Sequence, residues 1–155
     1  MLATPPTYVY PATVISIHDG DTVHCSIRLK KLSKRFKNDD WGFHIYVENG
    51  WVVLHTNIRL LGINCEELDK TAGQAAYDVL GTFLAKGDVV RVESSVPVHA
   101  VMADKYADRW LGVIYTAHQL NVNRAMLKAG AAAPYDGRGA VKPVPPYPFV
   151  PLVAS

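Results

Sequence analysis

The dipeptide Asn49-Gly50 lies between two β-rich runs and constrains the fold of this 155-residue chain more than any other short segment. Asn-Gly in this setting is a strong signal for a two-residue β-hairpin turn, because both residues tolerate positive φ. It predicts paired strands over residues 43–48 and 51–56. The second strand is expected to continue through Arg59 to Ile63.

Further strands are indicated on both sides of this hairpin. Residues 12–17 are β-prone, and Asp19-Gly20-Asp21 interrupts them as a turn or bulge. In the following strand apolar and polar side chains alternate, with Val23, Cys25 and Ile27 on one face. Residues 89–93 and 110–115 also have strand composition.

Two helices complete the pattern. Apolar side chains recur three and four residues apart over residues 72–84, with Thr71 as candidate N-cap and Gly87 as the stop. A shorter helix is expected over residues 121–129, ending at Gly130. The order of elements predicts an α+β fold: an OB-fold, five-stranded antiparallel β-barrel with two or three helices and an added β-hairpin.

Length and composition indicate one soluble globular domain, since 49% of the residues are hydrophobic and 19% are charged. We expect an N-terminal lead-in over residues 1–11, the globular domain over residues 12–140 and a proline-rich tail over residues 141–155. With two distant cysteines, no basic leader followed by an apolar run and no membrane-length apolar stretch, we expect a cytoplasmic, reduced protein, most simply a monomer.

Positive charge is concentrated in one place, although the net charge is only +2. Six basic residues occupy a ten-residue stretch: Arg28, Lys30, Lys31, Lys34, Arg35 and Lys37. Such a run is most often a solvated loop. Beside a phosphodiesterase site, it would instead be an arm for the substrate backbone.

Three short motifs carry candidate chemistry. Asp19-Gly20-Asp21 offers two carboxylates that can point the same way, one to bind a metal and one to orient it, although Asp-Gly is also a common turn. Arg59 lies in an apolar strand, where a guanidinium needs a carboxylate, a phosphate or solvent, and the Glu66-Glu67 pair follows shortly after.

The third motif is a polar run that enters a strand. Lys105 and Tyr106 are typical phosphate and nucleotide contacts, and Arg109 supplies a second arginine. A metal, a base for water and fixed positive charge are the parts that phosphodiester cleavage requires.

In this order, the three motifs resemble the staphylococcal (micrococcal) nuclease family, over about residues 12–135. The resemblance implies an OB-fold barrel, one bound Ca²⁺, and hydrolysis of DNA or RNA, single-stranded or frayed, by attack of a metal-associated water. By position, Asp21 corresponds to the main metal ligand, with Asp19 beside it. Arg59 and Arg109 correspond to the phosphate-binding arginines, and Glu67 to the general base.

The remaining positions combine matches with departures from the family pattern. The resemblance implies nucleotide contacts at Lys105, Tyr106 and Tyr135, and metal ligands at Asn64 and at the backbone carbonyl of Cys65. The family usually has an aspartate where Asn64 stands, so the metal site here has one negative charge less. Glu66 replaces a usual proline.

Two other functions remain open from the sequence. A catalytically inactive barrel of this family would bind nucleic acid or protein without cleaving anything. Alternatively, the histidines could form a zinc site, although no pair of them has the spacing of a known zinc motif.

Overall fold

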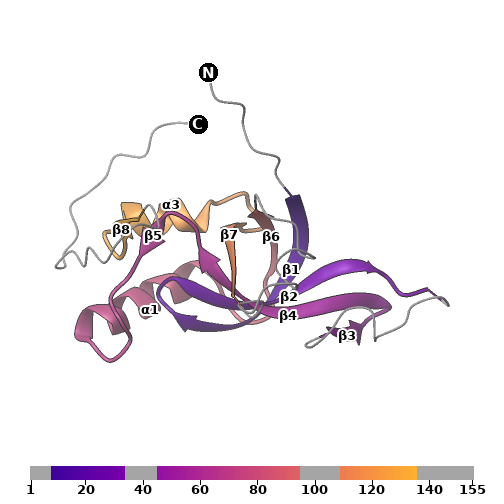
Figure 1. Ribbon diagram of the computed structural model, residues 1–155. Helices are drawn as coiled ribbons and strands as arrows, with labels where there is room; N and C mark the ends of the chain where they lie inside the picture. The colour runs from indigo at the N-terminus through magenta and orange to yellow at the C-terminus, as the bar shows by residue number, and fades with distance from the viewer. Residues whose placement is uncertain (1–7, 34–44, 95–108, 136–155) are drawn as a thin grey trace, which may run out of the picture.

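The computed structural model describes residues 8–33, 45–94 and 109–135. Within these ranges the chain forms a five-stranded barrel, a strand outside it, a separate two-stranded pair and two helices (Figure 1). The barrel strands are β1 (Tyr8–Asp19), β2 (Thr22–Lys31), β4 (Trp51–Leu60), β6 (Val89–Ser94) and β7 (Arg109–Tyr115). The other elements are β3 (Ile45–Glu48), β5 (Ile63–Asn64), β8 (Ala133–Pro134), α1 (Thr71–Phe83) and α3 (Val122–Lys128).

The barrel closes in the order β1-β2-β4-β7-β6, and β6 pairs back with β1. This arrangement confirms the predicted OB-fold α+β class. Its sheet is mixed rather than wholly antiparallel, because β4 and β7 run parallel. The chain between these two strands contains α1 and β6, which is long enough for the crossover that a parallel pair needs.

The predicted hairpin forms between β3 and β4. Asn49 has φ of 50° and Gly50 has φ of 79°, so both turn residues adopt the positive φ that the sequence predicted. The second strand continues through Arg59, as predicted, but it ends at Leu60, so the predicted continuation to Ile63 is wrong. Gly62, with φ of 85°, breaks the chain direction after Leu60, and Ile63 pairs separately with Pro134.

The helices match the predicted positions, with one correction. Thr71 is the first residue of α1 rather than its cap, since Lys70 is the N-cap and makes no side-chain capping bond. At α3, the Asn121 side chain accepts a hydrogen bond from the Arg124 N–H, as an N-cap does. None of the helices in the described ranges is long and apolar enough to cross a membrane.

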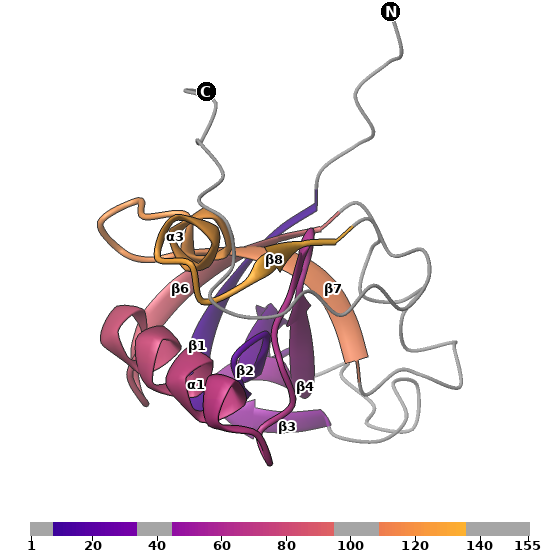
Figure 2. The same cartoon turned by 90° about the vertical axis from the view of Figure 1, so that its left-hand side faces the viewer.

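The core lies inside the barrel and beneath α1, which Figure 2 shows in front of the ring of strands. The predicted inward face of β2 is confirmed, because Val23, Cys25 and Ile27 are fully buried. On α1, Ala76 and Leu80 are buried as well. Two terminal segments fall outside the described ranges: residues 1–7, and residues 136–155 with the predicted proline-rich tail. Three of the basic residues also fall outside them, namely Lys34, Arg35 and Lys37.

Candidate active site

Asp21 is the centre of a polar cluster at the turn from β1 to β2. Asp21 is only 6% exposed to solvent. The Oδ2 atom accepts a hydrogen bond from the backbone N–H of Cys65 at 3.0 Å and forms an ion pair with Arg59 Nη1. The Oδ1 atom accepts a hydrogen bond from the Thr22 hydroxyl at 3.2 Å. These contacts hold both carboxylate oxygens of Asp21 in place.

Arg59 connects this carboxylate to the residues after β4. It lies opposite Thr22 in the β2–β4 register. Its Nη2 donates to Asn64 Oδ1 at 3.0 Å, and its guanidinium carbon lies 6.0 Å from the ring centre of Tyr135. One arginine therefore links Asp21 with Asn64, and Tyr135 lies alongside it.

Asp19 adds a second carboxylate. Its Oδ1 accepts a hydrogen bond from the backbone N–H of Asp21 at 3.1 Å. Burial raises the pKa of the Asp19 carboxyl, and the hydrogen bond to the Asp21 side chain and the charge of Asp21 raise it further. Two carboxylates therefore lie next to each other here, and Arg59 pairs with Asp21, so an additional cation beside Asp19 would be favourable.

Cys65 contributes its backbone rather than its sulfur. Burial, together with the charges of Asp21 and Asp19, raises the pKa of the Cys65 thiol well above its usual value. The sulfur packs against the turn, where a Cβ added to Gly20 would lie 3.0 Å from it and 2.6 Å from the Cβ of Ala76. Glycine at position 20 therefore allows the Asp19-Gly20-Asp21 turn to approach α1 this closely.

Glu67 lies in the turn between β5 and α1 and is exposed to solvent. Its backbone carbonyl accepts a hydrogen bond from the Lys70 N–H at 3.0 Å. A Cβ added to Gly73 would lie 1.8 Å from that carbonyl oxygen, so the turn rests directly on the α1 backbone. Gly73 thus determines how closely the Glu67 segment approaches the helix.

The last predicted site residues lie near or beyond the ends of the described ranges. Arg109 begins β7, where it pairs with Asn57, and Leu111 pairs with Arg59. The backbone of Arg109 therefore lies on the strand that pairs with the strand carrying Arg59. Lys105 and Tyr106 lie outside the described residues.

The donor chemistry of this cluster fits a hard cation. Among residues 8–33, 45–94 and 109–135, no group of three or more His, Cys, Asp or Glu side chains is arranged to hold a metal ion. The histidines of β2 and β4 have other partners: His24 bonds Asn57, and His55 bonds Glu48. Asp19 accepts a hydrogen bond from the backbone N–H of Asp21, and Arg59 links Asp21 with Asn64. The side-chain oxygens of these three residues are of the type that Ca²⁺ prefers.

Sequence reasoning missed several residues that build the site. Thr22 follows Asp21 directly, and its hydroxyl group is the sequence feature that could have indicated a hydrogen bond to the Asp21 carboxylate. The sequence does not indicate the contact of the Cys65 N–H with Asp21 or the close packing at Gly20 and Gly73, because these contacts depend on where α1 docks. Asn123 of α3 connects that helix to β7 and to the turn after β4. Its Oδ1 accepts a hydrogen bond from the Ile114 N–H, and its Nδ2 donates to the carbonyls of Leu61 and Gly112.

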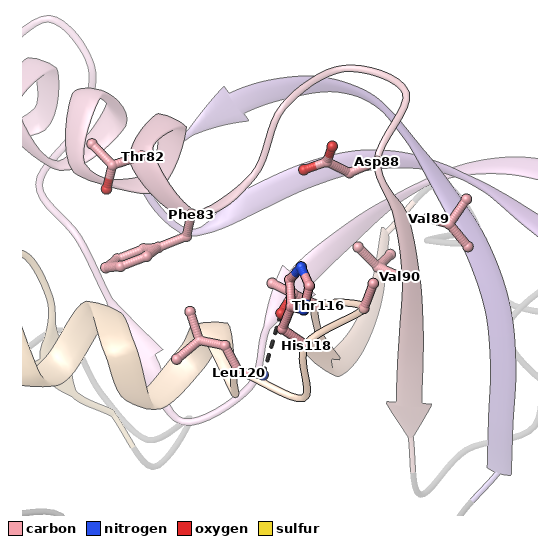
Figure 3. Close-up of a pocket in the computed structure, with 9 residues that line it drawn as sticks. Thr82, Phe83, Asp88, Val89, Val90, Thr116, His118 and Leu120 are labelled. Carbon is pink, nitrogen blue, oxygen red and sulfur yellow. Dashed lines mark hydrogen bonds between the residues drawn. The ribbon is translucent and has the colours of Figure 1, made fainter.

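A pocket of about 460 Å³ lies elsewhere on the molecule (Figure 3). Phe83 at the end of α1, Val90 of β6 and His118 of the segment before α3 are among its lining residues. None of the cluster residues around Asp21 lines it. The candidate active site is therefore the polar cluster around Asp21 rather than this cavity.

Comparison with known families gave one match. The model described as staphylococcal nuclease homologue matches residues 57–143, more than half of the chain. The matched segment contains Arg59, Asn64, Glu67 and Arg109, whereas Asp21 precedes it. A comparison with curated proteins gave no match. The barrel, the position of the cluster and the length of this match lead to one conclusion: the chain belongs to the staphylococcal nuclease homologue family.

Proposed function

We propose that this protein is a calcium-dependent phosphodiesterase that hydrolyses DNA, RNA or both at the cluster around Asp21. The observation that carries the proposal is the buried Asp21–Arg59 ion pair, which is linked to Asn64 on one side and to Asp19 on the other. In this arrangement carboxylate and amide oxygens lie beside a guanidinium, which supports roles as metal ligands and as a phosphate-binding group. Family membership supports a nuclease-type reaction.

The proposed calcium ligands are Asp21, Asp19, Asn64 and the backbone carbonyl of Cys65. Bound there, Ca²⁺ would neutralise charge on the phosphate oxygens. Asp21 is held for this role by the N–H of Cys65 and the hydroxyl of Thr22. The geometry around Asp21 is therefore set by the protein before any ligand arrives.

The proposed catalytic groups are Glu67, Arg59 and Arg109. Glu67 accepts a proton from the attacking water. Arg59 and Arg109 stabilise the negative charge that develops on the phosphate in the transition state. Arg59 uses two of its nitrogens on Asp21 and Asn64, and a guanidinium has five N–H donors, so others remain for a phosphate oxygen.

The proposed substrate contacts are Tyr135, Lys105 and Tyr106, on single-stranded or frayed nucleic acid. Tyr135 is half-buried beside Arg59, so a base stacked on its ring would lie next to the phosphate-binding group. Small barrel faces with aromatic side chains suit splayed nucleotides better than a rigid duplex.

Cleavage of end-labelled single-stranded DNA and RNA tests this proposal. We expect cutting in calcium, none in EGTA, and a loss of about 10²–10⁴-fold in rate for Glu67→Gln. Glu66→Gln is the matched control, since it removes the same charge from the adjacent position, and it should retain most of the activity. Equal losses in the two variants, or none in either, would rule out Glu67 as the base.

A second candidate function is an inactive barrel of this family that binds nucleic acid or protein. Two observations favour it: Asn64 carries no charge, and the Arg59 guanidinium already occupies Asp21 Oδ2. Thermal unfolding in calcium and in EGTA distinguishes the two functions, because a ligand that binds only the native state raises Tm. An unchanged Tm at high calcium would favour the inactive barrel.

A further inference from the structure

We propose that single-stranded nucleic acid leaving the cluster around Asp21 is held along the outer face of β2 and β4 as far as Arg28, Lys31 and Trp51. The name "arm" denotes here β3, residues 28–31 of β2 and residues 51–54 of β4. Figure 1 shows the arm extending from the barrel at the end opposite α1. The choice of ligand rests on the proposed function.

The strand register places the arm and the candidate site on one face. Side chains alternate along a strand, so Trp51 and Arg59, eight residues apart in β4, point to the same side. On β2, Thr22 lies opposite Arg59, and Lys31 lies opposite Trp51. An eight-residue span of strand is roughly 26 Å long, so the two ends of this face are suited to separate parts of one chain.

The far end of the face combines an aromatic ring with two cations. The guanidinium carbon of Arg28 lies 5.3 Å from the ring centre of Trp51, and the Lys31 ammonium lies 5.8 Å from it. Trp51 is half-buried and Lys31 is exposed. Base stacking on an aromatic ring beside positive charges is how proteins hold single strands without reading their sequence.

The middle of the face is polar and aromatic. Tyr46 is 48% exposed and stacks on His55, with ring centres 4.2 Å apart. His24 bonds Asn57 at 2.9 Å. These groups offer stacking surface and hydrogen bonds between the Trp51 end and the Arg59 end.

Charge complementarity selects a polyanion for this face. Within β2, β3 and β4, Glu48 is the single acidic residue, and both of its carboxylate oxygens have partners, Ser26 and His55. The arm therefore carries three basic side chains, Arg28, Lys30 and Lys31, against this one acidic side chain. A phosphodiester backbone complements this net positive charge.

Binding of fluorescein-labelled oligothymidylate in EGTA tests the proposal without any cleavage. We compare lengths at the two ends of the range that a barrel of this class covers, about 4 and about 16 nucleotides. The arm variant is Arg28→Gln/Lys31→Gln, in which the side chains keep much of their apolar length. The control is Lys86→Gln/Arg91→Gln, which removes two charges and the Arg91–Tyr115 ring contact away from β2 and β4.

We expect the arm variant to bind the long oligonucleotide about tenfold more weakly and the short one unchanged. Its slope of log affinity against log salt should fall by about 1.4, since two phosphate contacts are lost. The control should match the wild type for both lengths. Trp51→Leu should weaken long-strand binding, and Trp51→Phe should restore most of it.

Three outcomes would overturn the proposal: an arm variant that binds like the control, equal losses for both lengths, or a wild type that binds both lengths equally. Failure of the proposed hydrolysis is separate, because it is read from cleavage in calcium. A wild type that cuts nothing but binds long strands through the arm would support this inference and contradict the catalytic one. CD spectra and Tm confirm that each variant is folded.

Discussion

Asp21 and Arg59 form an ion pair that is almost entirely withdrawn from water, with side chains 9% and 11% exposed. The two residues come from the β1–β2 turn and the end of β4, so the pair ties these segments together. The backbone carbonyl of Asp21 also accepts a hydrogen bond from the Leu60 N–H at 2.8 Å. The candidate site is thus part of the barrel closure and not an addition on its surface.

Removal of one charge from this pair should be costly. Asp21→Asn leaves Arg59 buried without its counter-ion, and we expect the free energy of unfolding in EGTA to fall by about 3–5 kcal/mol. Urea denaturation measures this change. Glu93→Gln, which breaks the more exposed Arg91–Glu93 pair, is the control and should lower stability by about 0–1 kcal/mol. Similar values for the two variants would mean that the Asp21 pair is effectively solvated.

Two glycines of α1 should respond to alanine in opposite directions. Gly73→Ala places a Cβ 1.8 Å from the Glu67 carbonyl oxygen, so the turn must move, and we expect a loss of about 1–3 kcal/mol. Gly81→Ala meets nothing within 4 Å and should gain about 0.5–1 kcal/mol. Thermal denaturation of both variants checks the pair. A Gly73→Ala protein as stable as Gly81→Ala would contradict the described contact.

The raised pKa of Asp19 predicts a pH-dependent effect on stability. Because the folded protein disfavours the ionised form of Asp19, this group lowers the free energy of unfolding once the pH rises above its usual pKa of 3.8. Well below that pH the carboxyl is protonated in both the folded and the unfolded state, so it has no such effect. Asp19→Asn should therefore raise Tm in EGTA at pH 7 and leave it unchanged near pH 3. The amide oxygen can still accept the Asp21 N–H. Asp78→Asn, at an exposed position on α1, is the control for the change in net charge. A gain in Tm of the same size at both pH values for Asp19→Asn would contradict the raised pKa as its cause.

Most of the barrel could be predicted because its signals are local. The Asn49-Gly50 turn, the alternation around Cys25 and the Asn121 cap each depend on neighbouring residues alone. The parallel β4–β7 pair was missed because strand direction across a long crossover is set by how the whole chain packs. The end of β4 was missed because Gly62 lies between apolar residues that look like one continuous strand.

The candidate site was predictable in its residue types but not in its connections. Motif order brought Asp21, Arg59 and Asn64 into one hypothesis, and the structure places these three in one bonded cluster. The backbone contact from Cys65 and the packing of Gly73 against the Glu67 turn depend on tertiary approach. No spacing in the sequence encodes those distances, so sequence reasoning could not find them.

Calcium-dependent cleavage of phosphodiesters at this cluster is tested most directly at Asn64, the uncharged residue among the proposed side-chain ligands. The measurement is the cleavage rate of single-stranded DNA across a calcium titration, for the wild type and for Asn64→Asp. We predict that both cut, and that the added carboxylate lowers the calcium needed for half-maximal rate by about tenfold. A wild type that stays inactive at saturating calcium, while Asn64→Asp cuts, would contradict the account and identify the natural protein as an inactive barrel.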